Sequence, residues 1–154
     1  MMKTTLGWRE WLALPELGIP AIKAKIDTGA KTSALHAFFV EPFDKQGQTY
    51  VRFGLHPLQR RTSPEMICEA PLKEQRIVSD SGGHREQRYV IETMVALAGH
   101  SWPIEITLTD RESMRFRMLL GRSALGDDFL IVPQSSFLTG RELRTSYRNK
   151  GTQP

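Results

Sequence analysis

Cysteine and long hydrophobic runs are nearly absent from this chain. The one cysteine among its 154 residues, Cys68, excludes an internal disulfide and a cysteine cluster that binds zinc. No stretch approaches the ~20 apolar residues that a membrane helix needs. The first eleven residues carry Lys3, Arg9 and Glu10, where a secretory signal would be apolar. We therefore expect a soluble protein of the reducing cytoplasm with no membrane partner.

Motifs that hold metals or nucleotides are absent as well. The four histidines lie in unrelated contexts, and no two of them have the spacing of a metal site. Gly82 and Gly83 lack the spacing and the lysine of a phosphate-binding loop. The sequence therefore predicts no metal and no cofactor.

The composition is that of an ordinary globular domain. Hydrophobic residues make up 40% of the chain and charged residues 25%, which excludes wholesale disorder. We place one domain at residues 1–140 and a basic, polar tail at residues 141–154. The net charge of +4 is a mild bias toward acidic partners. We interpret the tail as a solvated terminus, with a nucleic-acid-binding arm as the alternative.

Alternation of apolar and polar residues over short distances predicts β-strands. In residues 20–26, the side chains of Ile22, Ala24 and Ile26 face one way and the two lysines between them face the other way. We also expect strands at 50–55, 89–97, 102–108, 116–120 and 129–132, a hairpin turn at 98–101 and a short helix at 121–125. This pattern predicts an all-β sandwich or barrel with one short helix.

The tripeptide Asp27-Thr28-Gly29 follows the first of these strands directly. Two carboxylates that share one proton can hydrolyse an amide, because one serves as base and the other as acid toward a bound water. Such carboxylates need a tight turn, in which a glycine allows close backbone approach and a threonine hydroxyl can form a locking hydrogen bond. A later segment, Leu119-Leu120-Gly121-Arg122, places two apolar residues and a glycine before the expected helix.

Together these two segments resemble the two-part signature of retropepsin-like aspartic proteases. The longer runs at 23–36, 88–92, 108–111 and 114–122 look like the bacterial members of that class that carry the name ATP-dependent zinc protease. That family is associated with RimK, the ligase that adds glutamates to a ribosomal protein, and it includes RimB-type members. The resemblance extends from about Ile19 to Leu138. It implies a retropepsin-like closed barrel and an aspartic-type peptidase that removes α-linked glutamates from the ribosomal protein.

One Asp-Thr-Gly in each chain is half of such an active site. We therefore expect a homodimer in which Asp27 of one chain faces Asp27 of the other, with Thr28 and Gly29 holding the turn. The segment Asp80-Ser81-Gly82 is a conceivable second copy, but no apolar-apolar-glycine segment of its own follows it. We interpret it as an ordinary hairpin turn.

Lysines stand where proteases of the retropepsin fold usually have apolar residues. Lys23 and Lys25 share a strand face with Asp27, and the resemblance implies that the position two before the catalytic aspartate lines the substrate pocket. We hypothesise that several cations bind the carboxylates of a glutamate-rich substrate. The alternative is a solvated strand edge that discourages aggregation. The predicted substrate-binding set is Lys23, Lys25, Lys31, Arg76, Arg88 and Arg122.

Two functions of different classes remain open at this point. The first is a homodimeric aspartic peptidase that acts on a glutamate-rich protein tail. The second is a β-barrel module that binds an anionic partner, such as RNA or an acidic protein tail, without cleaving it. We expect no nucleic-acid partner, because the sequence has no evident set of aromatic residues on which bases could stack.

Overall fold

The computed structural model describes residues 3–79, 82–110 and 115–148. Its first six strands are β1 (Thr4–Leu6), β2 (Arg9–Leu14), β3 (Ile19–Asp27), β4 (Ser33–His36), β5 (Phe39–Lys45) and β6 (Gln48–Leu55). They are followed by β7 (Met66–Ser79), β8 (Arg85–Leu97), β9 (His100–Thr109), β10 (Met118–Gly121) and β11 (Phe129–Ile131). The helical elements are α1 (Arg122–Leu125) and the 3-10 turns Pro15–Leu17 and Glu142–Thr145.

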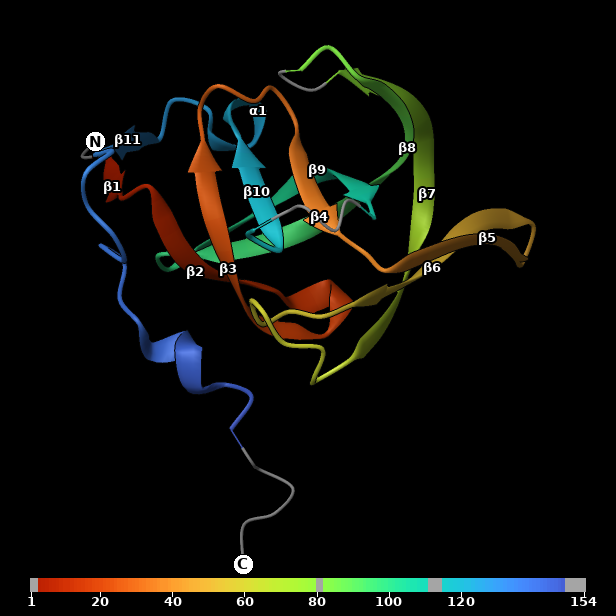
Figure 1. Cartoon of the computed structure of the whole chain (residues 1–154), viewed down its shortest axis with the longest axis horizontal. Coiled ribbons are helices and arrows are strands. Elements are labelled where there is room, and N and C mark those ends of the chain that lie inside the picture. Colours follow the sequence, from red (N-terminus) through yellow and green to blue (C-terminus); the bar gives the residue numbers. More distant parts are fainter. Residues whose placement is uncertain (1–2, 80–81, 111–114, 149–154) are drawn as a thin grey trace, which may run out of the picture.

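Nine of the strands form one sheet, in the order β2-β3-β10-β4-β9-β8-β7-β6-β5. Because β2 also pairs with β8 through Ala13 and Ala96, the first six strands of this order close into a ring (Figure 1). The remaining strands, β7, β6 and β5, continue the sheet from β8. The expectation of an all-β barrel with one short α-helix is confirmed for the described residues.

Much of the core lies inside this ring, and buried residues of β6 and β7, such as Phe53 and Cys68, belong to the same cluster. On β3, Ile22, Ala24 and Ile26 are buried, as their alternation predicts. Fully buried residues of other strands meet them there, among them Leu12, Leu35, Ile91, Ile106, Met118 and Leu120. Burial of apolar side chains contributes about 1.5–3 kcal/mol each, so the ring is a firm support for the turns at its rim.

Strand β10 connects parts of the chain that are far apart in the sequence. It pairs in parallel with β3 on one side and antiparallel with β4 on the other. The loop between β3 and β4 and the helix α1 therefore emerge at the same edge of the ring, at the top of Figure 1. This edge contains the Asp-Thr-Gly segment.

Two hairpins organise the other half of the sheet. Strands β8 and β9 join through a two-residue turn in which Ala98 and Gly99 both have positive φ angles, 56° and 79°, so the hairpin predicted at 98–101 is confirmed. Strands β7 and β8 form a longer hairpin that rises toward the rim that carries α1 (Figure 1). The predicted hairpin turn at Asp80 and Ser81 lies outside the described residues.

The C-terminal segment differs from the solvated terminus that we expected, as far as residue 148. Residues 142–145 form a 3-10 turn, and the Tyr147 hydroxyl donates a hydrogen bond to the carbonyl of Ala21 over 2.7 Å. Burial raises the pKa of this hydroxyl to about 12. The phenol that donates to β3 therefore ionises less readily than a free tyrosine. Residues 149–154 lie outside the description.

Candidate active site

Asp27 is the last residue of β3, and its carboxylate is partly exposed at the rim of the ring. The backbone N–H of Gly29 donates a hydrogen bond to Asp27 Oδ1 over 3.1 Å, and the N–H of Ala30 donates to the Asp27 carbonyl over 3.2 Å. These two bonds close the turn. Within the described residues the Thr28 hydroxyl has no hydrogen bond, so the locking bond expected from it is not seen within one chain. Thr28 and Gly29 are exposed.

Gly121 supports this turn from the neighbouring strand. It pairs with Asp27 in the register of β10 and β3, and its N–H donates to Ser33 Oγ over 3.0 Å. A Cβ atom at residue 121 would lie 2.7 Å from the carbonyl carbon of Thr32 and 3.0 Å from the carbonyl oxygen of Ala30. Only glycine lets β10 pass this close to the loop that follows Asp27.

The first residues of α1 hold the same loop by hydrogen bonds. Arg122 donates from its N–H to the Ala30 carbonyl over 2.9 Å and from Nη1 to the Gly29 carbonyl over 3.1 Å. Ser123 donates to the Lys31 carbonyl from both its N–H and its hydroxyl. The Asp-Thr-Gly loop is thus fixed by the apolar-apolar-glycine segment and the helix that follows it.

The cations of the predicted substrate-binding set fall into two groups. Lys25, Lys31 and Arg122 are exposed at or beside the Asp27 loop. Among the described residues none of the three lies within 4.0 Å of a carboxylate oxygen. Lys23 is partly buried, and the aromatic rings of Trp11 and Phe137 flank its ammonium group. The positive charges of these four side chains are therefore available to bind an anionic ligand.

Arg88 belongs to the interior instead. It is 7% exposed, and its guanidinium donates to Thr107 Oγ1 over 3.3 Å and to Glu86 Oε2 over 3.0 Å. Thr107 in turn donates to the carbonyl of Ser33, over 3.0 Å. A buried cation requires such partners. Through Thr107, Arg88 thus supports the start of β4, and its contact with substrate stays a prediction.

Arg76 is also engaged within the chain. It lies on β7 and forms ion pairs with Glu74 at 2.7 Å and with Glu105 at 3.1 Å. Lys73 approaches the other oxygen of Glu105 to 2.6 Å. The hydrogen bond from Lys73, followed by that from Arg76, holds the pKa of Glu105 below its ordinary value of 4.5, although partial burial opposes this shift. Arg76 therefore links β7 to β9 and its charge is already paired there, while its contact with substrate stays a prediction.

The described residues offer no evident metal site. No group of three or more His, Cys, Asp or Glu side chains among them could hold a metal ion, so the zinc in the name of the resembling family does not fit the ligands present there. Cys68 is 3% exposed and its thiol points to the carbonyl of Leu17 at 3.4 Å. Burial raises the pKa of this thiol to about 11, so it is protonated at neutral pH and a poor nucleophile.

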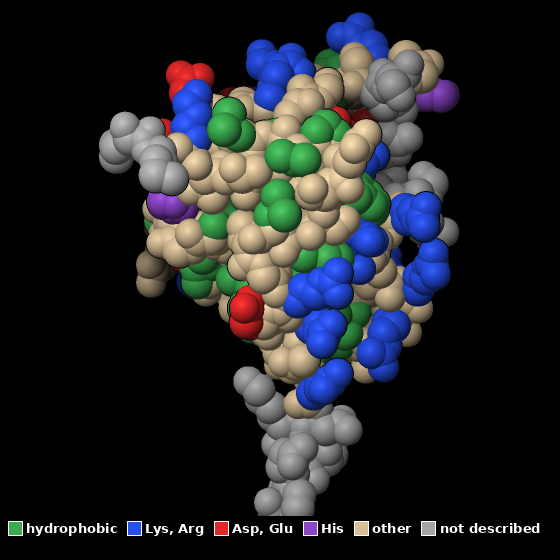
Figure 2. Space-filling model, turned by 90° about the vertical axis from the view of Figure 1, so that its left-hand side faces the viewer, with side chains coloured by type: hydrophobic (Ala, Val, Ile, Leu, Met, Phe, Trp, Pro, Cys, Tyr) green, Lys and Arg blue, Asp and Glu red, His purple; other side chains and the backbone are tan. Residues whose placement is uncertain are grey.

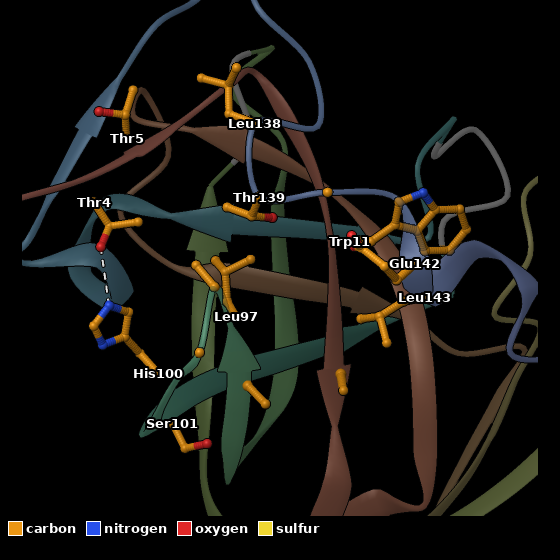
Figure 3. Close-up of a pocket in the computed structure, with 15 residues that line it drawn as sticks. Thr4, Thr5, Trp11, Leu97, His100, Ser101, Leu138, Thr139, Glu142 and Leu143 are labelled. Atoms are coloured by element: carbon orange, nitrogen blue, oxygen red, sulfur yellow. Dashed lines mark hydrogen bonds between the residues drawn. The ribbon is translucent and has the colours of Figure 1, made fainter.

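A groove of about 770 Å³ lies away from Asp27. It is bounded by the β8–β9 turn, β1, β2 and residues 138–140, 142 and 143, with Trp11 and Glu142 on one side and His100 on the other (Figure 3). Thr4 and His100 are hydrogen-bonded across one of its ends, at 3.1 Å. None of the predicted site residues lines it.

Within the described residues, no helix has the length and apolar character needed to cross a bilayer.

Comparisons with known proteins show the family to which the chain belongs. Residues 5–142 match the family model described as RimB-like, retropepsin-like aspartic endopeptidase RimB. A probable α-L-glutamate ligase of Shewanella halifaxensis is 44% identical over 140 residues, which are 91% of this chain and 31% of the relative. A probable α-L-glutamate ligase of Parasynechococcus marenigrum is 46% identical over 138 residues, 90% of this chain and 30% of the relative. The chain thus spans about a third of the length of these curated relatives.

A solved structure has a similar fold. The crystal structure of the protein Lpg0085 of Legionella pneumophila, described as a protein of unknown function, superposes with a TM-score of 0.74. The two chains are 26% identical, and the match covers 88% of this chain and 98% of the other.

Proposed function

The chain belongs to the family of RimB-like, retropepsin-like aspartic endopeptidases, and on that premise we propose that it is an aspartic-type endopeptidase. Its active site would form between two copies, each of which contributes one Asp27. The supporting observation is the buttressed turn: Asp27 lies beside Gly121, and Arg122 donates into the same loop. A carboxylate held on a rigid, exposed turn is suited to meet its counterpart in a second chain.

The proposed reaction needs both carboxylates. With one proton shared between the two Asp27 side chains, the ionised carboxylate takes a proton from a bound water, whose oxygen attacks the carbonyl carbon of the peptide bond. The protonated carboxyl gives its proton to the carbonyl oxygen, and a tetrahedral intermediate forms. The carboxyl that took the proton from water then gives it to the leaving nitrogen as the carbon–nitrogen bond breaks. The other carboxylate takes a proton from a hydroxyl of the intermediate, so the products are a carboxylic acid and an amine and the pair again holds one shared proton.

We propose a substrate rich in α-linked glutamates, such as a glutamate tail on a ribosomal protein. Lys25, Lys31 and Arg122 surround the Asp27 loop with positive charge that the described residues do not neutralise by an ion pair. The relatives named α-L-glutamate ligases support the same substrate chemistry, because a ligase and a peptidase for one type of linkage act on the same peptide.

Mass spectrometry of a peptide that ends in several glutamates, incubated with the purified protein, tests this proposal. We expect loss of glutamates with the parent chain, none with Asp27→Asn, and no effect of a chelator. A peptide with glutamines in place of the glutamates is the matched substrate control. Activity that falls more steeply than in proportion to protein concentration on dilution supports the dimer. An Asp27→Asn variant that cleaves as fast as the parent would contradict the proposal.

The second candidate is a module that binds anionic partners without hydrolysis, and the exposed cations are the observation that favours it. The same Asp27→Asn variant separates the two functions. If the parent chain binds the glutamate peptide as tightly as the variant does and leaves it intact at every concentration, the binding module is the correct description.

A further inference from the structure

Three cations surround the ring of Phe137 on the outer face of β2 and β3. The guanidinium carbons of Arg9 and Arg141 lie 4.8 and 4.7 Å from the ring centroid, and Lys23 Nζ lies 5.9 Å from it. We call these four residues the Phe137 cluster. In the described part of the chain, none of the three cations is within 4.0 Å of a carboxylate oxygen.

The backbone that carries Phe137 is held firmly in an unusual conformation. Phe137 has a φ angle of 56°, which is uncommon for a residue with a side chain, and its N–H donates to the Arg9 carbonyl over 3.0 Å. The fully buried carboxylate of Glu10 accepts hydrogen bonds from the N–H of Leu138 and from the N–H and hydroxyl of Thr139. A costly conformation that its surroundings enforce is a reason to look for a function.

Aromatic contacts hold the three cations close together. Besides Phe137, Arg9 lies over the ring of Trp8 at 4.6 Å and Lys23 over the ring of Trp11 at 5.7 Å, and such contacts stabilise a cation. The three positive charges nevertheless repel one another, and an anion would relieve that repulsion. The pKa of Lys23 is lowered, by burial first and then by the charges of Arg9 and Arg60. Arg141 is exposed, so the positive field of the cluster reaches solvent. Figure 2 shows Lys and Arg side chains gathered on the lower right of this face of the molecule.

The cluster is continuous with the Asp27 site along β3. Lys23, Lys25 and Asp27 lie on one strand face, and the pairing of β2 with β3 places Arg9 beside Lys25. A strand rises about 3.3 Å per residue, so the Cα of Lys23 is roughly 13 Å from that of Asp27. An extended peptide covers this distance in about four residues.

We infer that the Phe137 cluster is a second anion-binding subsite, which takes side-chain carboxylates of an acidic peptide about four to six residues from the bond held at Asp27. This inference rests on the proposed function, because it assigns the subsite to the same substrate. An acidic peptide fits better than a nucleic acid, because cations flank the Phe137 ring and leave no open platform for a base to stack on. The subsite would make the enzyme favour long glutamate tails over short ones.

Binding to a chain that carries Asp27→Asn tests the inference, because this variant leaves the peptide intact. Fluorescently labelled peptides of four and of twelve glutamates are titrated at low and at physiological salt. We expect the longer peptide to bind more tightly, and Arg141→Gln to weaken its binding by about three- to tenfold while leaving the four-residue peptide unaffected. Arg52→Gln, at an exposed arginine of β6, is the matched control and should bind both peptides normally.

Three results would overturn the inference. Arg141→Gln could bind the long peptide as tightly as its parent, or Arg52→Gln could weaken binding equally, which would indicate a diffuse charge effect. A single-stranded RNA of the same charge could bind more tightly than the peptide and depend on Arg141, which would assign the cluster to nucleic acid. Failure of the proposed peptidase activity is measured separately, as the absence of cleavage by the parent chain. It does not change the interpretation of these binding results.

Discussion

Gly121 and Asp27 lie side by side at the end of two parallel strands, in the last register pair of β10 and β3. The contact is close enough that the loop after Asp27 would collide with any side chain at residue 121. The position of the Asp27 carboxylate therefore depends on the lack of a Cβ atom at residue 121. This dependence gives the first prediction.

Substitution Gly121→Ala should displace the Asp27 loop. The added Cβ meets backbone atoms of Thr32 at 2.7 and 2.8 Å, and overpacking of this kind costs about 1–3 kcal/mol in the free energy of unfolding. We expect a lower midpoint of thermal unfolding together with loss of peptidase activity. The control is Gly47→Ala, in the turn between β5 and β6 with a φ angle of 80°. It should reduce stability by about 1–2 kcal/mol and leave activity unchanged; equal loss of activity in both variants would contradict the prediction.

Substitution Lys25→Ala should affect the substrate more than the fold. Lys25 is exposed, so its removal changes the free energy of unfolding little. In a closed cleft, the loss of a hydrogen bond to a charged carboxylate costs about 1.5–3 kcal/mol, or roughly a 10- to 100-fold decrease in kcat/KM. Steady-state kinetics on a glutamate-tailed peptide measures this decrease. Lys45→Ala, at an exposed lysine of β5, is the control, and unchanged turnover by Lys25→Ala would exclude the proposed role.

Substitution Glu10→Gln should loosen the C-terminal segment. The two oxygens of Glu10 accept four hydrogen bonds, from Gly7, Leu138 and twice from Thr139. A glutamine amide turns one acceptor into a donor, and each buried donor left without a partner costs about 1–3 kcal/mol. Denaturant unfolding should show the loss, with the exposed Glu41→Gln as control. Hydrogen exchange confined to residues 136–140 should accelerate; a uniform increase over the whole barrel would argue against this local role.

The ion pairs of Glu105 predict a pH dependence of stability. Its pKa is lowered in the folded chain, chiefly by Lys73 and then by Arg76, so the folded state favours the ionised form. This contribution is present above the ordinary pKa of 4.5 and is lost as the pH falls through the lower, folded value. The stability difference between the parent and Glu105→Gln should therefore be larger at pH 7 than below pH 4. A difference that stays constant between these pH values would refute the assignment.

Regular alternation made part of the fold predictable. Strands β3, β6, β8 and β9 follow from their apolar residues at every second position, because one face of each strand must enter the core. Strands β1, β2, β4, β5 and β7 were not among the predicted ones. Most of the second half of β7 is exposed and carries charged residues between Lys73 and Arg76, so the periodic apolar signal fails there.

Local sequence also did not indicate the partners of some charged residues. Arg76 and Arg88 were predicted to bind substrate, and in the structure Arg88 contacts Thr107 of the neighbouring strand β9, while Arg76 reaches across β8 to Glu105 of β9. Glu10 gave no signal of being buried, because the donors that stabilise it belong to residues near the other end of the chain. Pairings of this kind depend on which strands become neighbours, which no local pattern encodes.

The amino-acid sequence by itself determined an apolar strand, a sharp turn that carries Asp27, and a later apolar segment that ends in Gly121, because strand alternation and turn chemistry are local properties. Only the tertiary structure decided that Gly121 fits against that turn, that Arg88 is inside and that Arg9, Lys23 and Arg141 meet around Phe137. The physical reason is that closure of the ring brings distant segments into contact, and those contacts determine which charges are neutralised and which remain open to a ligand.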